Sequence, residues 1–302
     1  MTALLTVAGV SKRFGRVEAL TGLTLSVAPG ERVALLGHNG AGKTTLLRLI
    51  LGFLRPDAGS IRVGDHAPDS TAARRAVAYL PENVAFPKAL TGRELIGFYA
   101  RLRDVSTDDA MAALERVGLA HAADRASGTY SKGMRQRLGL AQALLGSPRL
   151  MLLDEPTSGL DPLSRHDFYA LVDVVAAAGT AVLLSSHSLS EIEARTDRVA
   201  ILREGRLVAD APLSRLQAEA ALPVRIRVRA QPETIDDVSD RLGGTRVNGQ
   251  TVELIFSQTE KMRRLAAISA LGPLVTDFDV TQPSLDDIYV HFSRAAGEGG
   301  AS

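Results

Sequence analysis

One stretch near the N-terminus matches the pattern of a phosphate-binding loop without a gap. Its residues are Gly37, His38, Asn39, Gly40, Ala41, Gly42, Lys43 and Thr44. An apolar stretch typical of a buried strand precedes the loop, and apolar residues at helical spacing follow it. In such a strand–turn–helix unit, backbone N–H groups and the helix dipole favour an anion at the turn. Lys43 would then contact the outer phosphates, and the Thr44 hydroxyl would bind a Mg²⁺ that bridges them.

Two acidic residues at the end of a later predicted strand indicate which reaction the phosphate-binding loop could support. The stretch from Leu150 to Leu153 is apolar throughout, which predicts a strand buried on both faces. Asp154 follows it and could bind Mg²⁺ through water, while Glu155 could accept a proton from an attacking water. Without the loop, two acids at a strand end are more often merely solvated. With the loop present, we interpret Asp154 as a metal ligand and Glu155 as a general base.

A histidine and a helix start could contribute further contacts to phosphate. His187 follows the apolar stretch Ala181 to Leu184, at the carboxyl end of a predicted strand, where open α/β sheets bind ligands. Ser131 is a predicted N-cap and Gly133 lies in the first turn of its helix, so the free N–H groups there form a second anion site. A single His is more often structural, and capping alone would explain Ser131. The order of all these features along the chain favours the functional interpretation.

The composition excludes some classes of function. The 302 residues are 45% hydrophobic, which is enough for a large core and two domains. Thirty-five basic against 34 acidic residues give a net charge of +1, which offers no electrostatic argument for nucleic acid as a partner. Cysteine is absent, which excludes disulfides and thiolate metal sites and suits the cytoplasm. The start lacks a secretory signal, and Asp173 and Gly179 interrupt the most apolar stretch, so we expect no membrane span.

The pattern along residues 1–221 predicts an α/β domain. Strands are expected at residues 4–10 and 21–28, with an exposed turn at residues 12–15 between them. Short strands and turns follow. Residues from about 89 to 147 then have the periodicity of several amphipathic helices, which predicts a helical subdomain inserted into the α/β domain.

A second, smaller domain is predicted to follow. Residues 224–229 alternate strictly between apolar residues and arginine, which is typical of a half-buried strand. The elements expected from there have the order β-α-β-β-α-β, which is that of a ferredoxin-like domain. We therefore assign residues 222–293 to a small α+β domain that ends in a helix from Ser284 to Phe292. The Gly-rich residues 294–302 are expected to be a disordered tail.

Residues 3 to about 215 resemble the ATP-binding subunit of ABC transporters. GHNGAGKT corresponds to that family's Walker A motif, YSKGMRQ to its signature, LMLLDEP to Walker B, SGLD to the D-loop and SSH to the switch histidine. The resemblance implies a P-loop fold with a RecA-like core, an antiparallel β subdomain and a helical subdomain. It also implies that the protein binds ATP and Mg²⁺ and hydrolyses ATP.

The same resemblance gives roles to single residues. Phe14 would stack on adenine, His187 would contact the γ-phosphate, and Ser131 with Gly133 would contact ATP bound to a second protomer. The nucleotide-binding residues would be Phe14, the eight loop residues Gly37 to Thr44, Thr45, Ser131 and Gly133. The metal ligands would be Thr44, Glu82 and Asp154. The catalytic residues would be Glu155 and His187.

The sequence departs from the family pattern in two places. The signature contains Tyr130, Lys132 and Met134 where Leu, Gly and Gln are usual. Glu82 stands at the position of the Q-loop glutamine. A carboxylate at that position could ligate Mg²⁺, but it cannot donate a hydrogen bond when ionised.

Within the family, several stretches resemble the NosF ATPases, which belong to the transporter that supports maturation of the copper enzyme nitrous oxide reductase. These stretches are YLPENVAFPKALTGREL, GLAHAADRASGTYSKGMRQRLGLAQALLG, LPVRIRV and QPSLDDIY. The resemblance implies three partners, namely a second ATPase protomer, a membrane permease and a periplasmic accessory protein. It also places the protein peripherally on the inner, cytoplasmic face of the cell membrane. The alternatives are the ATPase of another exporter, of drugs, lipids or polysaccharides, and a non-transport ABC ATPase that acts on DNA or ribosomes.

Overall fold

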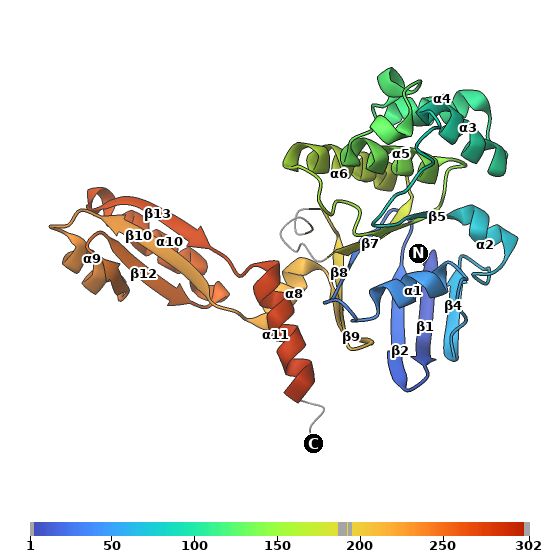
Figure 1. Ribbon diagram of the computed structural model, residues 1–302. Helices are drawn as coiled ribbons and strands as arrows, with labels where there is room; N and C mark the ends of the chain where they lie inside the picture. Colours follow the sequence, from blue (N-terminus) through green and yellow to red (C-terminus); the bar gives the residue numbers. More distant parts are fainter. Residues whose placement is uncertain (1–2, 187–191, 193–194, 299–302) are drawn as a thin grey trace. The chain divides into compact units, whose positions relative to one another are not determined.

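The computed structural model describes residues 3–186, 192 and 195–298 (Figure 1). His187, for which the sequence predicts a γ-phosphate contact, lies outside the described residues. The chain divides into two compact units, Met1–Ala211 and Pro212–Ser302. Each unit has its own hydrophobic core.

A six-stranded sheet forms the centre of the N-terminal unit. Its strand order is β5-β6-β7-β3-β8-β9, and every pair is parallel except β8 with β9. The strands are β3 (Arg32–Leu36), β5 (Val77–Leu80), β6 (Leu150–Asp154), β7 (Ala181–Ser186), β8 (Arg198–Arg203) and β9 (Arg206–Ala211). Strands β6 and β7 are buried along their whole length, as their largely apolar sequences predict.

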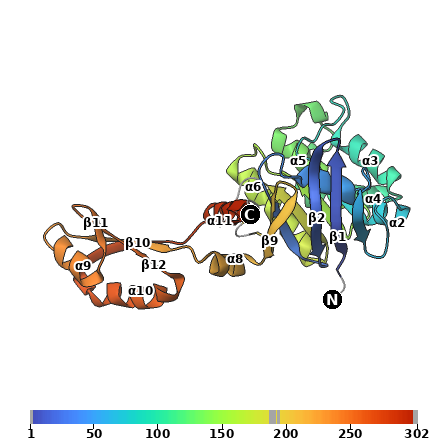
Figure 2. The same ribbon diagram turned by 90° about the horizontal axis from the view of Figure 1, so that it is seen from below.

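A three-stranded antiparallel sheet packs on helix α1 in the same unit. Its order is β2-β1-β4, and Figure 2 shows β1 and β2 side by side. The elements are β1 (Leu5–Phe14), β2 (Val17–Val27), β4 (Ala58–Val63) and α1 (Lys43–Ile50). The apolar face of α1 joins core residues of both sheets in one cluster. The first turn of α1 therefore has a fixed position relative to both sheets.

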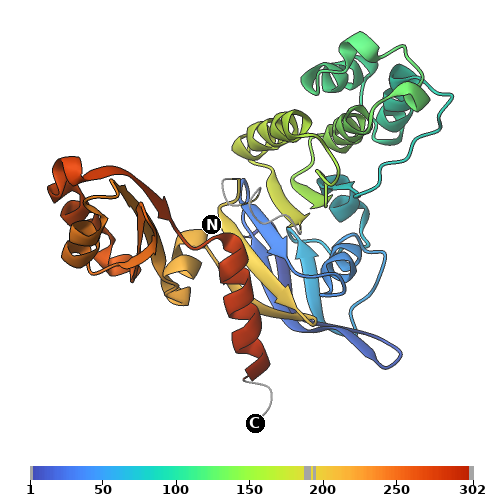
Figure 3. The ribbon, with the colours of Figure 1, turned by 60° about the vertical axis from the view of Figure 1, so that its left-hand side comes forward.

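The predicted helical subdomain is present. Its helices α3, α4 and α5 group together on one side of the unit (Figure 3). Besides α1, the helices in the described part of this unit are α2 (Thr71–Ala76), α3 (Gly92–Leu102), α4 (Thr107–Arg116), η1 (Ala120–Ala122), η2 (Ser127–Thr129), α5 (Lys132–Leu144) and α6 (Pro162–Ala177). Among the described residues, no helix combines the length and the hydropathy that a membrane span requires.

The C-terminal unit contains a four-stranded antiparallel sheet of order β11-β12-β10-β13. Its elements are α8 (Leu213–Ala220), β10 (Val224–Ala230), α9 (Ile235–Leu242), β11 (Thr245–Asn248), β12 (Thr251–Phe256), η3 (Gln258–Glu260), α10 (Lys261–Ala270), η4 (Gly272–Leu274), β13 (Val275–Thr281) and α11 (Leu285–Glu298). From β10 to β13 the α-helices and strands follow the order β-α-β-β-α-β. The alternation in β10 buries its apolar residues and exposes its arginines, as the pattern predicts.

The turn predicted at residues 12–15 is displaced, because β1 continues to Phe14 and the turn falls at Gly15 and Arg16. An acid on the neighbouring segment holds this polar end of the strand. Asp57 accepts a hydrogen bond from Lys12 Nζ at 2.8 Å and another from the backbone N–H of Arg13 at 2.7 Å. The strand therefore extends beyond its apolar residues, where sequence periodicity gives no indication of it.

Two predicted boundaries in the C-terminal part also need correction. The division between the units falls after Ala211 rather than after residue 221, because α8 packs on α11 within the C-terminal unit. The tail predicted to be disordered from residue 294 is helical as far as Glu298. The alanines near its end have a high helix propensity, so the helix continues where the small, Gly-rich sequence predicted disorder.

A stability prediction follows from the burial of β6. Leu152 is fully buried in this central strand, whereas Leu102 on α3 is 66% exposed. Replacing Leu152 with Ala should destabilise the N-terminal unit by about 2–5 kcal/mol, because the sheet cannot close the cavity. The same change at Leu102 should cost less than about 0.5 kcal/mol. Urea denaturation followed by circular dichroism measures both, and equal effects would contradict the assignment of β6 to the core.

Candidate functional site

A cavity of about 450 Å³ opens at the carboxyl ends of the central strands. Its lining residues are Val17, Glu18, Ala19, His38, Asn39, Gly40, Gly42, Lys43, Thr44, Thr45, Glu82, Asp154, Glu155 and Glu204. Most of the predicted phosphate-binding loop is among them. The loop and the two predicted catalytic acids therefore face the same space.

Parallel pairing of three strands brings these groups together. In the register of the sheet, Leu36 of β3 lies opposite Ser186 of β7, and Asp154 of β6 lies opposite Ser185. The phosphate loop begins directly after β3, and Glu155 comes directly after β6. Because parallel strands end at the same edge of a sheet, the three segments converge there.

The loop itself depends on close backbone approaches that only glycine permits. Gly42 has φ of +108°, and a Cβ atom on it would lie 2.7 Å from the carbonyl oxygen of Ala19. A Cβ on Gly37 would lie 2.6 Å from the carbonyl oxygen of Leu202. These two glycines therefore let the loop pack against β2 and β8, which fixes the direction of its N–H groups.

Lys43 is the first residue of α1 and is buried in the pocket. Its ammonium group donates a hydrogen bond to the Gly37 carbonyl, which holds it across the loop. The same group lies 3.9 Å from Glu155 Oε1. A buried ammonium between the loop and this carboxylate is placed for charge pairing with phosphate oxygens.

Both carboxylate oxygens of Asp154 have partners in the structure. Oδ1 accepts from the Ser185 hydroxyl at 2.6 Å, and Oδ2 accepts from the Tyr79 hydroxyl at 3.3 Å. Burial raises the pKa of Tyr79 to about 12, and the neighbouring Asp154 adds to this shift, so the phenol keeps its proton and donates. Each oxygen retains lone pairs for a cation or its water.

Glu155 has an unusual backbone conformation. Its φ is +46°, in the left-handed region that costs a non-glycine residue about 1–3 kcal/mol. Its backbone N–H donates to the Ser185 carbonyl at 3.1 Å and to the Ser185 hydroxyl at 3.2 Å. Hydrogen bonds to the neighbouring strand thus hold the residue in this conformation and direct its side chain into the pocket.

The other predicted site residues divide into two groups. Thr44, Thr45 and Glu82 line the pocket together with the residues described above. Gly37 and Ala41 lie behind it and form the loop's inner side. Within the described part of the chain, Phe14, Ser131 and Gly133 do not line it, and the structure does not describe His187.

Phe14 lies at the end of β1, opposite Val17, and Val17 lines the pocket. Phe14 is 46% exposed, and Lys12 Nζ lies 5.7 Å from the centre of its ring. Phe14 therefore does not belong to the hydrophobic core, where a single phenylalanine is usually found. Stacking of Phe14 on adenine stays a prediction.

The signature residues form the start of α5. The Ser131 hydroxyl accepts from the Met134 N–H at 3.1 Å, so the predicted N-cap is confirmed. Tyr130 is buried, and its hydroxyl donates to the Ala122 carbonyl at 2.7 Å. Tyrosine therefore replaces the usual leucine at this position without leaving a buried polar group unpaired.

Sequence patterns missed four lining residues, namely Val17, Glu18, Ala19 and Glu204. The first three open β2, and Glu204 lies in the turn between β8 and β9 with φ of +48°. The neighbouring Gly205 donates its N–H to the Ala41 carbonyl at 3.0 Å. A Glu-Gly pair between two apolar stretches could have indicated this hairpin turn, but nothing in the sequence places it beside the loop.

The charges of the pocket fit a divalent cation bound together with a polyanion. Among the lining residues that the structure describes, Lys43 is the only lysine or arginine. The acidic lining residues are Glu18, Glu82, Asp154, Glu155 and Glu204. Phosphate groups would be repelled by this set unless a cation came with them, and hydroxyl and carboxylate oxygens are the ligands that Mg²⁺ prefers.

Comparisons with known proteins agree with this geometry. Residues 20–158 match the family model described as ABC transporter. The chain is 34% identical over 302 residues to the daunorubicin resistance ATP-binding protein DrrA3 of Streptomyces coeruleorubidus, covering 96% of this chain and 95% of that protein. It is 36% identical over 262 residues to the Nod factor export ATP-binding protein I of Burkholderia lata, covering 84% and 86%. A solved structure described as the ATP binding subunit of an ABC transporter aligns with a TM-score of 0.66 and 31% identity, covering 72% of this chain and 92% of its own.

The chain therefore belongs to the ABC transporter ATP-binding family, and it is an ATPase with the P-loop fold of that family. ATP is its nucleotide. ATPase subunits of this family act with membrane permeases and usually as dimers.

The contacts of Ser185 generate a prediction about the metal. Replacing Ser185 with Ala removes the donor to Asp154 Oδ1 and one acceptor of the Glu155 N–H. The Mg²⁺ concentration that gives half-maximal ATPase activity should then rise about tenfold, because the ligand loses its orienting partner. Thr180 is the matched control, since its hydroxyl donates to the Pro148 carbonyl just before β7 begins. An unchanged Mg²⁺ dependence in the Ser185 variant would count against Asp154 as a ligand.

Proposed function

We propose that Lys43, Asp154 and Glu155 hydrolyse Mg-ATP by the roles predicted from their sequence positions. Lys43 and the loop N–H groups hold the outer phosphates. Thr44, Asp154 and Glu82 would hold a Mg²⁺ ion, which would offset the charge of the phosphates. Glu155 accepts a proton from the attacking water, and His187 contacts the γ-phosphate. The observation that carries this proposal is the pocket in which Lys43 and Glu155 lie 3.9 Å apart.

Ser131 and Gly133 support a dimeric form of the enzyme. They lie in the same unit as the pocket but are not among its lining residues. The capped N-terminus of α5 nevertheless has free N–H groups suited to phosphate. We propose that these groups complete the site of a second ATPase protomer in a homodimer, so that ATP bound at two composite sites stabilises the closed dimer.

Glu82 supports coupling to a membrane permease. It lines the nucleotide pocket, and the chain runs from it through residues 83–91 to α3. This helix and the segment before it expose Leu90, Phe98 and Leu102. We propose that this segment passes the motion of the site to a permease on the inner face of the cell membrane. An apolar exposed surface next to the coupling segment is a suitable contact for such a partner.

We further propose that the transporter supports nitrous oxide reductase maturation, together with a periplasmic accessory protein. The support is the resemblance to NosF ATPases in four stretches, one of which contains Glu82 and another the signature helix. Cysteine is absent and the five methionines and six histidines are scattered along the sequence, so the partners would handle copper or sulfur.

Export of another compound is the second candidate. The relatives named for daunorubicin resistance and Nod factor export favour it, and they match this chain over most of its length. Both candidate functions use the same nucleotide-binding motifs. The two functions would differ in the membrane permease and therefore in the transported compound.

We also propose a ferredoxin-like fold for residues 224–281. The element order and the sheet order β11-β12-β10-β13 support it. Such a fold implies no function by itself.

The general-base assignment can be tested with Glu155→Gln. The amide keeps the size of the side chain but cannot accept the proton, so ATP should still bind while turnover falls by at least about a hundredfold. Nucleotide binding and phosphate release should be measured on the same preparation. Glu204→Gln is the matched control, because Glu204 lines the pocket without a proposed role in proton transfer. Robust hydrolysis by Glu155→Gln would refute the assignment.

The cargo can be tested by deleting the gene from its host and restoring it as wild type or as Glu155→Gln. If the maturation proposal holds, the deletion and the Glu155→Gln strain should both yield nitrous oxide reductase with low copper content and low activity. The wild-type gene should restore both properties. A fully active reductase in the deletion strain would contradict this proposal, and a simultaneous gain in drug sensitivity would support export instead.

A further inference from the structure

Tyr79 contacts the proposed metal ligand Asp154 from β5, the strand at one edge of the central sheet. In the parallel register of β5 and β6, Tyr79 lies opposite Leu152, two residues before Asp154. Alternate residues of a strand share a face, so the three side chains lie on the same face of the sheet. The Tyr79 hydroxyl is 3.3 Å from Asp154 Oδ2, and the hydroxyl donates because an ionised carboxylate only accepts. The ring itself packs against the apolar core.

The strands on both sides of β6 each supply one hydroxyl to Asp154. Tyr79 on β5 bonds Oδ2, and Ser185 on β7 bonds Oδ1. The Ser185 hydroxyl also accepts from the Glu155 backbone N–H. Among the described contacts, the Tyr79 hydroxyl bonds Asp154 alone. Removing this hydroxyl therefore frees one side of Asp154 and leaves the bonds of Glu155 intact.

The chain that follows Tyr79 leads to Glu82, the other acid with a proposed metal role. Leu80 and Val84 both pack against helix α5 at Gly139. A Cβ atom on Gly139 would lie 2.7 Å from Leu80 Cδ1 and 3.1 Å from Val84 Cγ2. Contact with α5 therefore fixes the chain two residues before Glu82 and two residues after it. Because Tyr79 joins the start of this segment to Asp154, it links the two acids.

We propose that Tyr79 is a positioning residue that sets the spacing between Asp154 and Glu82 and thereby favours Mg²⁺ over larger divalent cations. The inference rests on the metal roles proposed for these two acids. Mg²⁺ requires a nearly ideal octahedron with ligands at about 2.0–2.1 Å, whereas Ca²⁺ accepts irregular arrangements at about 2.3–2.6 Å. Fixed carboxylates therefore matter more for the smaller ion. Without the Tyr79 hydroxyl, Asp154 is less well oriented relative to Glu82, and the preference for Mg²⁺ falls.

The test measures nucleotide binding by the full-length protein that carries Glu155→Gln, so that turnover does not interfere. The Kd of a fluorescent ATP analogue is determined with Mg²⁺, with Ca²⁺ and with EDTA. Adding Tyr79→Phe, which keeps the ring, should raise the Kd about tenfold with Mg²⁺ and less than about threefold with Ca²⁺. With EDTA the Kd should stay within about twofold, because Lys43 and the loop hold the phosphates without the metal.

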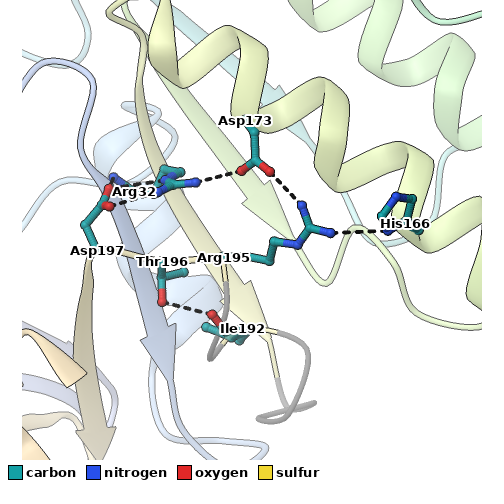
Figure 4. Close-up of polar contacts among 7 residues, drawn as sticks. All are labelled: Arg32, His166, Asp173, Ile192, Arg195, Thr196 and Asp197. Carbon is teal, nitrogen blue, oxygen red and sulfur yellow. Dashed lines mark hydrogen bonds and ion pairs between the residues drawn. The ribbon is translucent and has the colours of Figure 1, made fainter. Parts of the chain in front are cut away.

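Two control variants in the same background separate positioning from a general loss of stability. Tyr99→Phe removes a hydroxyl from another half-buried tyrosine, which is not among the described lining residues of the pocket. Asp173→Asn weakens a polar network in which Asp173 accepts from Arg32 and from Arg195, each at 2.7 Å (Figure 4). Arg32 is the first residue of β3, whereas the phosphate loop follows the last residue of that strand. Both controls should keep the ratio of the Mg²⁺ and Ca²⁺ Kd values within about twofold, even if Asp173→Asn lowers the melting temperature more than Tyr79→Phe does.

The outcomes distinguish the inference from the metal assignment on which it rests. Asp154→Ala should weaken binding with Mg²⁺ at least as much as Tyr79→Phe does, because it removes the ligand itself. If Asp154→Ala has no effect, the metal role of Asp154 fails and the inference fails with it. If Asp154→Ala weakens binding while Tyr79→Phe keeps the full preference for Mg²⁺, only the inference fails. An equal rise of the Kd under all three conditions would also overturn it, because such a pattern indicates a general distortion of the pocket.

Discussion

The parallel pairing of β3, β6 and β7 is the constraint on which the site depends. Each strand carries a run of apolar residues that must be buried on both faces, so the sheet needs a layer on each side. The cluster that includes α1 and the antiparallel sheet covers one face. Once the strands are parallel and in register, the polar residues after each apolar run meet at one edge. The phosphate loop, Asp154 with Glu155, and Ser185 are neighbours for this reason.

The packing of the loop then determines the charge of the pocket. The Ala19 carbonyl lies where a Cβ on Gly42 or on Gly205 would clash, at 2.7 Å in both cases. Two hairpins can therefore approach the loop closely, and they bring Glu18 and Glu204 with them. Because these acids add to the catalytic ones, a cation that accompanies phosphate would offset their negative charge.

The parts of the site that could be predicted are those that lie close together in the sequence. The loop and the pair Asp154 and Glu155 each have local patterns, and the structure places both in one pocket. Glu204 has no such pattern, because its place depends on a hairpin that packs against the loop. The sequence pattern did not predict the end of β1 for a similar reason. Asp57, which accepts the hydrogen bonds that hold this end, lies on a distant segment. The grouping of α8 with α11 likewise depends on a contact between residues far apart in the chain.

The proposed role of Glu82 follows from what a carboxylate can bind. An ionised carboxylate only accepts hydrogen bonds, so Glu82 cannot donate to a phosphate or to a water oxygen as an amide would. In a pocket lined by four other acids, its favourable partner is a cation. Glu82 lines the pocket among these acids, and a bound Mg²⁺ would attract its carboxylate further toward the site. Since the chain leads from Glu82 directly to α3, the position of the helical subdomain would respond to the metal that ATP brings. Nucleotide can shift the helical subdomain between two positions only if it binds the protein more tightly in one position than in the other. The attraction between Mg²⁺ and Glu82 would supply such a difference in affinity.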